Sequence, residues 1–198
     1  MDQFFTADYN GAPFILFGTA HLAALSVIAA VNLGLGIWGH RLTAPQRRGF
    51  RIALALVLLI NEAFWHLWNL INGQWSVQTM LPLQLCSVFV FLSAAMLVSR
   101  SQVLYEFTYF LGIGGALQAL MTPDAGIYGF PHFRFWQVFL SHGGIITAAI
   151  YMTMVEGFRP TWRTVLKVIL GGNLYMLLVG GINLVLESNY LMICGKPG

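Results

Sequence analysis

The amino-acid sequence predicts an all-α polytopic membrane protein in which residues 1–198 form one transmembrane domain, a bundle of six helices. The composition is 58% apolar and only 9% charged, and the mean hydropathy is +0.72. Soluble domains carry about 25% charged residues, so an ordinary globular enzyme is excluded. Six apolar runs are each long enough to cross a bilayer. The alternating ten-residue segments of membrane β-barrels are absent, which leaves helices to satisfy the backbone hydrogen bonds in lipid.

The six expected spans follow one another with short connectors. They cover residues 14–38, 50–71, 80–98, 104–121, 135–155 and 164–186. The first span follows a segment that contains Asp2 and Asp8 and has no basic region, so we expect it to stay in the mature protein. Basic connectors follow the first, third and fifth spans. Turn-forming residues separate the remaining spans, as in the connector between the fourth and the fifth.

Eight of the ten Lys and Arg residues fall on one side of the predicted bundle. They are Arg41, Arg47, Arg48, Arg51, Arg100, Arg159, Arg163 and Lys167, whereas Arg134 and Lys196 fall on the other side. The positive-inside rule places the eight in the cytoplasm and the N-terminus outside. We therefore expect a multi-pass plasma-membrane protein whose partners are membrane lipids. The net charge of +3 then reflects topology rather than binding to nucleic acid.

Polar side chains inside the spans are expected to gather at one level. By the helical rise, they lie about 4 to 11 Å below the outer ends of their own spans. They are His21, His66, Gln84, Gln118, His142 and Asn183. Because polar groups in lipid need a partner, a cavity or a function, this convergence predicts an outward-facing polar pocket for a lipid or small ligand. The inner half is expected to be almost purely apolar.

The second span carries the strongest single pattern. Glu62, His66, Asn69 and Asn72 follow at spacings of four, three and three, which places them on one helix face. A carboxylate and an imidazole one turn apart can share a proton. An interhelical hydrogen-bond ladder is the structural alternative. Glu62 favours a functional role, because an acid near the middle of the bilayer must be protonated, paired or hydrated.

His142 is the second candidate centre, since two glycines follow it and leave space beside its ring. Ser141 precedes it, and Gln137 lies five residues earlier. A packing role for the imidazole is the alternative. Cys86 is expected to face away from the polar level, because it is about 200° around the helix from Gln84.

Three functional hypotheses remain open. In the first, the pocket performs acyl transfer or hydrolysis, with His142 or His66 as general base and Glu62 orienting an imidazole. Ser87, Ser141 or water then serves as nucleophile, and Asn69, Gln84, Gln118 and Gln137 line the site. In the second, the protein is a transporter or receptor without chemistry, and in the third it is a structural subunit. The spacing of ligand residues does not favour a metal site, and we expect no cofactor.

Four segments of the chain resemble a known family. Leu-Pro-Leu-Gln-Leu-Cys-Ser at 81–87, Leu-Met-Thr-Pro-Asp at 120–124, Phe-Pro-His-Phe-Arg-Phe at 130–135 and Ser-His-Gly at 141–143 are similar to the YwaF-like bacterial integral membrane proteins. The resemblance implies a seventh hydrophobic helix after the Cys-Gly-Lys-Pro segment at 194–197.

More distantly, the chain is similar to eukaryotic transmembrane protein 164, an acyltransferase that moves fatty acyl groups between phospholipids with a cysteine and a histidine. The resemblance implies that His142 matches that histidine. Where the relative has its cysteine and a following histidine, this chain has Leu83 and Gln84. The resemblance therefore does not supply an acyl-enzyme cysteine.

Overall fold

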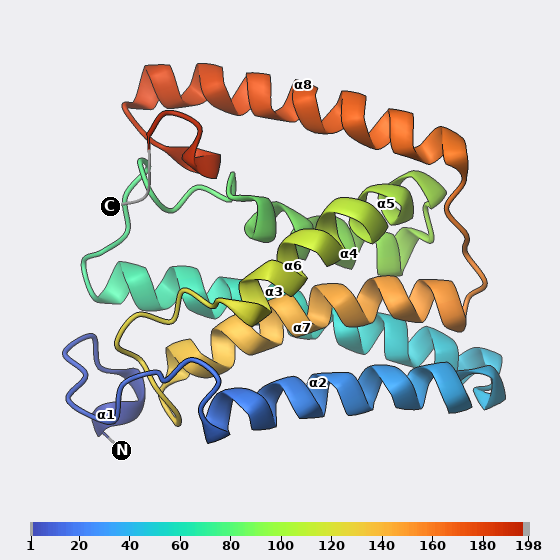
Figure 1. Cartoon of the computed structure of the whole chain (residues 1–198), viewed down its shortest axis with the longest axis horizontal. Coiled ribbons are helices and arrows are strands. Elements are labelled where there is room, and N and C mark those ends of the chain that lie inside the picture. The colour runs from blue at the N-terminus through green and yellow to red at the C-terminus, as the bar shows by residue number, and fades with distance from the viewer. Residues whose placement is uncertain (1, 196–198) are drawn as a thin grey trace.

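The computed structural model describes residues 2–195, and its regular secondary structure there is entirely helical, which confirms the predicted all-α class. The longer helices (Figure 1) are α2 (Thr19–Trp38), α3 (Ala44–Ile71), α4 (Leu85–Ser99), α5 (Gln102–Phe107), α6 (Ile113–Met121), α7 (Phe133–Met154) and α8 (Trp162–Leu186). Four short helical elements are α1 (Asp2–Phe5), η1 (Gly39–Arg41), η2 (Thr108–Gly112) and η3 (Tyr190–Met192). Lys196, which entered the charge count, and the last residues of the segment at 194–197 lie outside the described residues.

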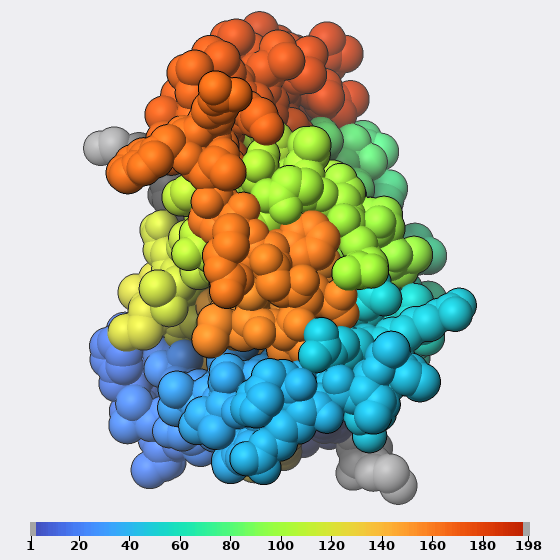
Figure 2. Space-filling view, turned by 90° about the vertical axis from the view of Figure 1, so that its right-hand side faces the viewer, coloured from blue at the N-terminus to red at the C-terminus, as the bar shows by residue number. Residues whose placement is uncertain are grey.

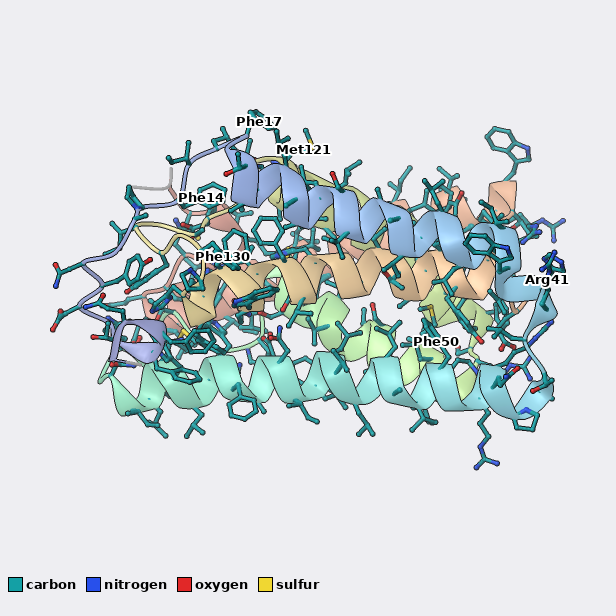
Figure 3. All side chains as sticks on the ribbon, turned by 90° about the horizontal axis from the view of Figure 1, so that it is seen from below. Phe14, Phe17, Arg41, Phe50, Met121 and Phe130 are labelled. Carbon is teal, nitrogen blue, oxygen red and sulfur yellow. The ribbon has the colours of Figure 1, made fainter. Side chains whose placement is uncertain are left out.

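The two ends of the bundle differ in charge. The end formed by residues 3–18, 72–84, 122–132 and 187–195 is named the terminal end here. The opposite end carries the α2–α3, α4–α5 and α7–α8 connectors and is named the basic end. All eight cations that the sequence groups together lie in or beside those three connectors, as Arg41 does in Figure 3. The predicted segregation of positive charge is therefore present in the fold.

Two helices start at different residues from the predicted spans. α2 begins at Thr19 rather than residue 14, because Phe17 has a positive φ of 57° and cannot continue a right-handed helix. α3 begins at Ala44 rather than residue 50. There, Thr43 and Gln46 form a capping box that satisfies free backbone N–H groups of the first turn. The apolar run marks the lipid-facing part of this helix, and its cap lies two turns earlier.

Helix α4 is shorter than the predicted third span. It begins at Leu85 rather than residue 80, after a series of turns that includes Pro82. Proline lacks a backbone N–H and disfavours the helical conformation in the residue before it. Gln84 is the N-cap residue, with an extended backbone (φ −66°, ψ 144°). The polar residues near the start of this span are therefore in a non-helical segment.

The fourth predicted span is a continuous helical stretch interrupted by a π-helical turn, η2, between α5 and α6. A π turn holds more residues than an α turn and changes which side chains share a face. Gly112 ends this turn between α4 and α7. A Cβ atom there would lie 3.1 Å from Phe89 and 3.3 Å from Ile145, so glycine allows the three elements to pack closely.

Helix α7 runs through the centre of the bundle and packs against α2, α3, α4 and α6. Two consecutive glycines set its distance from two neighbours. A Cβ at Gly143 would lie 2.8 Å from Ile28 of α2, and one at Gly144 would lie 2.7 Å from Leu58 of α3. Small residues of this kind allow close helix approach in membranes. Most of α7 is consequently surrounded by protein rather than exposed.

Four helical stretches among the described residues are long and apolar enough to cross a membrane. They are Thr19–Arg41, Ala44–Ile71, Gln102–Met121 and Trp162–Leu186. α4 has 15 residues and extends about 22 Å, which is less than the hydrocarbon core of about 30 Å. α7 does not meet the same criterion and carries several polar residues in its first half. Length and composition thus support a polytopic membrane protein with four such stretches rather than the six predicted.

Two acids with largely buried side chains lie near the basic end, so the half of the bundle that was expected to be the inner one is less apolar than the sequence suggests. Glu156 contacts Arg51 at 3.4 Å and Arg100 at 2.9 Å, which joins α3 and α4 to the end of α7. Glu106 of α5 contacts Lys167 of α8 at 3.1 Å. These ion pairs connect neighbouring helices where the chain turns.

Helix α8 lies at the edge of the bundle, with α4, α5 and α6 between it and the layer of α2, α3 and α7 (Figures 1 and 2). Beside the basic end it is held by the Glu106–Lys167 pair. Beside the terminal end, the Tyr175 hydroxyl donates to the Leu83 carbonyl at 2.7 Å. Between these attachments its faces are largely exposed and apolar.

Tyr190 of η3 ties the segment after α8 to the α3–α4 connector. Its hydroxyl donates to the Val77 carbonyl at 2.7 Å and accepts a hydrogen bond from the Leu81 N–H at 2.9 Å. The residue is 1% exposed, and burial raises the pKa of its hydroxyl above the ordinary value. The hydroxyl therefore stays protonated and keeps both bonds at neutral pH.

Candidate functional site

Two candidate sites lie on opposite sides of helix α4. The first is a group of polar side chains between α3, α4 and α7, named the polar cluster here. Its members are Asn61, Glu62, His66, Ser87, Arg134, Gln137 and Ser141. The second is a large cavity between α4, the α5–α6 stretch and α8, named the α8 pocket here.

The polar cluster begins with hydrogen bonds between α3 and α7. Asn61 donates from Nδ2 to Ser141 Oγ at 2.7 Å and to the Gln137 carbonyl at 3.1 Å. The Gln137 side chain donates to the same Ser141 oxygen at 3.3 Å. All three residues are buried, and Gln137 and Ser141 share a face because they are one turn apart. Ser141 is thus occupied by two amide donors and has no basic partner.

Arg134 lies at the edge of the polar cluster nearest the terminal end. Its guanidinium carbon is 3.9 Å from the centre of the Trp65 ring, a cation–π contact. The same group donates to the Gln137 side-chain oxygen and to the Asp124 carbonyl, the latter at 3.0 Å. These contacts join the α6–α7 connector to α3 and hold a positive charge beside the cluster.

Glu62, His66 and Ser87 form the ionisable part of the polar cluster. Glu62 Oε1 lies 3.7 Å from His66 Nε2 and has no hydrogen-bond partner among the described residues. His66 Nδ1 accepts a hydrogen bond from Trp75 Nε1 at 3.1 Å, so the proton of a neutral imidazole is on Nε2, facing Glu62. The Ser87 side chain of α4 also faces the Glu62 carboxylate.

The order of these three groups limits their chemistry. In a serine hydrolase triad the imidazole lies between the serine and the acid. Here the Glu62 carboxylate is next to both Ser87 and His66, so the acid rather than the imidazole holds the central position. Among residues 2–195, no three His, Cys, Asp or Glu side chains are arranged to hold a metal ion. The cluster can move a proton between its carboxylate and its neighbours.

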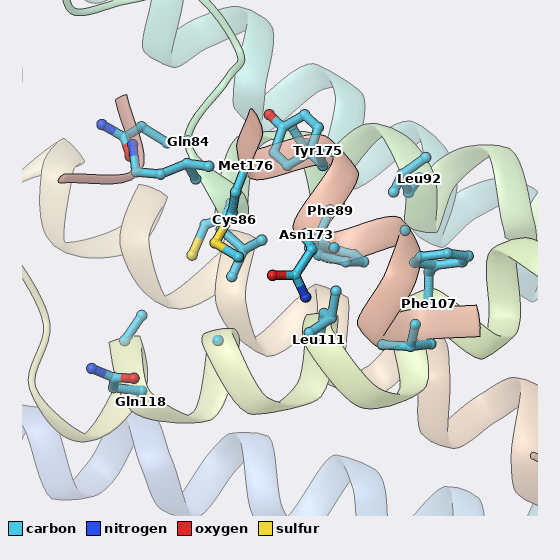
Figure 4. A pocket seen from close by; sticks show the side chains of 18 of the residues that line it. Gln84, Cys86, Phe89, Leu92, Phe107, Leu111, Gln118, Asn173, Tyr175 and Met176 are labelled. Carbon is cyan, nitrogen blue, oxygen red and sulfur yellow. The ribbon is translucent and has the colours of Figure 1, made fainter. Parts of the chain in front are cut away.

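The α8 pocket has a volume of about 1000 Å³ and is lined mostly by apolar side chains (Figure 4). Phe107 and Leu111 face it from the α5–α6 stretch, and Met176 faces it from α8. Its polar lining consists of uncharged groups. They are Gln84, Cys86, Gln118, Thr122, Asn173 and Tyr175.

Glycines help to keep the α8 pocket open. Gly172 of α8 faces it, and a Cβ atom there would lie 3.5 Å from the Leu111 side chain, which is ordinary contact. Gly115 faces it from α6, where a Cβ would lie 3.1 Å from Leu85. Larger side chains at these positions would project into the cavity and reduce its volume.

Cys86 does not face away from Gln84, because both line the α8 pocket. The expectation assumed that a helical turn of about 200° separates the two residues. Gln84, however, is the extended N-cap residue, and the helix begins only at Leu85. Counting helical angles from a residue outside the helix therefore placed the thiol on the wrong side.

His21 lies apart from the polar cluster and from the α8 pocket. Its Nδ1 accepts a hydrogen bond from the Phe17 N–H at 2.9 Å, and its Nε2 lies 2.8 Å from the Leu120 carbonyl, to which it donates. The imidazole is 1% exposed. Both ring nitrogens are engaged in joining the start of α2 to the end of α6.

Asn69 and His142 bond to backbone carbonyls of their own helices and not to the polar cluster. Asn69 donates to the Trp65 carbonyl of its own helix at 2.8 Å and is buried. His142 Nδ1 donates to the Val138 carbonyl of its own helix at 2.7 Å. It follows Gln137 by five residues, about 140° around α7, and so lies on a different face from the polar cluster.

The structure thus brings together five of the predicted residues, Glu62, His66, Ser87, Gln137 and Ser141. Three further participants were not singled out from the sequence, namely Asn61, Arg134 and Trp75. Asn61 directly precedes Glu62, so its position could have been noticed. The fold of the α3–α4 connector is what brings Trp75 to His66, and no local pattern indicates it.

The comparisons with known proteins identify a family. The model of the TMEM164 family matches residues 16–198, which is nearly the whole chain. No curated protein and no solved structure gave a significant match. The polytopic helical fold and the extent of this match agree, and the chain belongs to the TMEM164 family.

Proposed function

We propose that the protein is a membrane protein that holds the hydrocarbon part of a membrane lipid in the α8 pocket. The observation that carries this proposal is a cavity of about 1000 Å³ between helices that are apolar enough to lie in a bilayer. Ligand cavities commonly range from about 300 to 1,000 Å³. The pocket is therefore large enough for a substantial ligand.

The chemistry of the lining supports a hydrocarbon ligand. Phenylalanine, leucine, isoleucine, valine and methionine side chains make up most of the wall. Burial of apolar surface is favourable by roughly 25 cal/mol per Å² when the alternative is water. A lipid chain that enters from the bilayer gains less free energy from this burial, because it leaves an apolar environment. Its binding then depends on the packing and shape of the pocket wall.

The proposal includes six membrane spans, with α4 and α7 crossing together with the four long apolar stretches. α7 is surrounded by α2, α3, α4 and α6, so its polar side chains face protein rather than lipid. α4 packs against α3 and α7, and the non-helical residues before it add length at the terminal end. Irregular backbone at membrane depth is tolerated where protein surrounds it.

We also propose that the basic end is cytoplasmic and that the N-terminus lies outside, in a bacterial plasma membrane. The charge segregation and the likeness to YwaF-like proteins support this orientation. A cysteine introduced at exposed Arg48 should be labelled only from the cytoplasmic side, and one at exposed Gln74 only from outside. Labelling of position 48 from outside would overturn the orientation.

Filling the pocket tests the lipid-binding proposal. Gly172→Phe places a ring in the cavity from a position where a Cβ makes ordinary contact. We expect lipid that co-purifies with the protein in mild detergent, measured by native mass spectrometry, to fall about tenfold, which is 1.4 kcal/mol of binding. The matched control is Gly181→Phe on the same helix, where a Cβ would meet no atom within 4 Å and which lies outside the pocket.

Retention of lipid by Gly172→Phe at the level of the unsubstituted protein would overturn the proposal. Equal loss in the Gly181→Phe control would also overturn it, because the effect would then arise from α8 itself rather than from the cavity. Because no chemistry is required for binding, the same assay applies whether the protein is an enzyme, a transporter or a receptor.

Acyl transfer or hydrolysis is a second candidate function. The observation that favours it is the proximity of Glu62 of α3 to Ser87, which lies at the start of α4 beside the pocket-lining residues Cys86 and Gln84. In this candidate, Glu62 accepts the Ser87 proton and His66 stabilises the carboxylate. His142 retains a role only if it reaches the ligand from its own face of α7.

Lipid composition separates the second candidate from binding alone. Ser87→Ala and Glu62→Gln should change the acyl composition of membrane phospholipids in cells that express them, compared with the unsubstituted protein. His142→Ala is the matched test of the imidazole that the family likeness suggests. Identical lipid profiles in all three variants and the parent would exclude acyl transfer and hydrolysis and leave ligand binding.

A further inference from the structure

We propose that the α8 pocket selects a lipid with an uncharged head that offers carbonyl or hydroxyl oxygens, such as a diacylglycerol, over a charged phospholipid. This inference rests on the proposed lipid-binding function and names the ligand class. It comes from the charge of the pocket wall and from the hydrogen-bond groups at one end of it.

The wall of the pocket is uncharged. Among the described residues that line it, none is Asp, Glu, Lys, Arg or His. Lys167, which directly precedes the lining residue Val168, is already paired with Glu106 at 3.1 Å. A phosphate drawn into this space would lose its hydration without gaining a cation, which is unfavourable. An ester or hydroxyl head carries no such penalty.

Two glutamine amides lie at the end of the pocket nearest the terminal end. Gln84 precedes α4 and Gln118 lies in the last turn but one of α6, on opposite sides of the cavity (Figure 4). The Gln84 Oε1 atom accepts from the Leu191 N–H at 3.1 Å, which leaves its NH₂ group free to donate. The Gln118 side chain makes no hydrogen bond to another described residue. Both amides can donate to a neutral oxygen acceptor.

The position of these amides matches the form of a lipid. They lie at the terminal end of a cavity whose remaining length runs along α8 toward Phe107, near the basic end. An amphiphile placed with its head between the glutamines would extend its chains along the apolar wall. A lipid bound in the opposite direction would place its head beside Phe107 and Leu111, where the neighbouring Asn173 amide already donates to the Ile169 carbonyl at 2.7 Å.

Photoactivatable lipids test the selectivity directly. The full chain is placed in phosphatidylcholine nanodiscs with a trace of diazirine-labelled diacylglycerol or of phosphatidylglycerol with the same chains. Cross-links to α4, α6 and α8 are quantified by mass spectrometry. We expect the diacylglycerol to label these helices about tenfold more than the phosphatidylglycerol.

Substitutions identify the side chains that produce the preference for diacylglycerol. Gln118→Met keeps the size of the side chain and removes the amide, and it should reduce the preference for diacylglycerol to less than about threefold. Leu117→Met is the matched control, because Leu117 is exposed and lies outside the pocket. It should keep the preference of the unsubstituted protein.

Equal labelling by the two lipids, or an unchanged preference in Gln118→Met, would overturn the selectivity. In either case Gly172→Phe distinguishes the two proposals. If it removes both labels, the pocket binds lipid without this preference. If it removes neither, the lipid-binding proposal itself fails.

Discussion

The polar cluster and the α8 pocket lie on opposite sides of the same helix and show opposite kinds of packing. In the polar cluster, Asn61 of α3 bonds to Ser141 of α7 at 2.7 Å, and the same two helices approach closely next to the cluster, where Gly144 faces Leu58. In the α8 pocket, α8 stands away from α4 and α6 and leaves about 1000 Å³ between them. The polar cluster is enclosed by helices on several sides, whereas the pocket lies beneath a helix at the edge of the bundle.

The comparison illustrates what holds helices together in a bilayer. Lipid tails are as apolar as leucine, so an apolar helix face gains little by exchanging lipid for protein. Polar side chains gain hydrogen bonds that lipid cannot provide. Consequently amides and hydroxyls make the polar contacts between α3 and α7, and the polar contacts of α8 come from Lys167, Tyr175 and the polar residues after its end.

The largest expected difference is in stability, between a glycine substitution at the α3–α7 interface and one in the α8 pocket. Gly144→Phe should destabilise the fold by about 3 kcal/mol, because its Cβ alone would lie 2.7 Å from Leu58. Gly172→Phe should change stability by less than about 0.5 kcal/mol, because the ring enters open space. Thermal unfolding in detergent measures both. Similar losses in both variants would show that the pocket is closed in the folded protein.

A smaller difference is expected when an amide is removed from each region. Asn61→Leu should cost about 1 kcal/mol, since it removes the bonds to Ser141 and to the Gln137 carbonyl. Asn173→Leu in the pocket should be nearly neutral, because its side chain bonds only to the Ile169 carbonyl of its own helix. Unfolding in a denaturing detergent series compares the two. Neutral behaviour of Asn61→Leu would remove the polar cluster as a stabilising contact.

The Tyr190 hydroxyl is one of the groups that attach the segment after α8 to the rest of the bundle, together with the Leu191–Gln84 hydrogen bond. Tyr190→Phe loses the bonds to Val77 and Leu81 and should cost about 1 kcal/mol, mostly as faster hydrogen exchange in α8 rather than in α3 or α7. Tyr109→Phe is the control, since the Tyr109 hydroxyl makes no hydrogen bond to a described residue. An equal increase in hydrogen exchange in all helices would contradict the expectation that α8 opens without α3 and α7.

The smallest expected effect is a pH dependence at the terminal end, outside the spans. His132 Nδ1 accepts from the Arg134 N–H at 3.0 Å, and Nε2 donates to the Thr6 carbonyl at 3.0 Å. Burial lowers the pKa of this imidazole below its ordinary value of 6.5. The unfolded chain therefore binds more protons than the folded one below about pH 6.5. The contribution of the neutral His132 imidazole to stability is complete above that pH and decreases as the pH falls toward the lower pKa of the folded state.

Protease cleavage within residues 3–9 measures the pH effect. Cleavage should increase between about pH 7 and pH 5 in the unsubstituted protein. His132→Gln should be equally sensitive at both pH values. Cleavage that rises with pH instead would show that the imidazole is charged in the fold.

Much of the helical framework could be predicted from the sequence, because long apolar runs have few alternatives in lipid. The expected ends agree at Trp38, Ile71, Met121 and Leu186. The predicted starts of α2, α3 and α4 were less accurate. A positive φ at Phe17 sets the start of α2, a capping box that of α3 and a preceding proline that of α4. Hydropathy does not register these backbone effects.

The candidate site could be predicted only in part. The Glu62–His66 pair follows from helical spacing alone, and its 3.7 Å separation agrees. The predicted polar layer does not explain the contacts of two histidines. His21 joins α2 to α6, and His142 bonds to its own helix. Helical spacing predicts only how far along its helix a side chain lies, whereas the direction of each side chain around the bundle depends on packing between helices.

The attachment of α8 by its two ends has a consequence for how a ligand would arrive. In the membrane arrangement proposed above, the space beneath the middle of this helix adjoins the hydrocarbon region rather than the aqueous phase. Occupancy would then be governed by the mole fraction of the ligand among the surrounding lipids, and dilution of the protein in buffer would leave it unchanged.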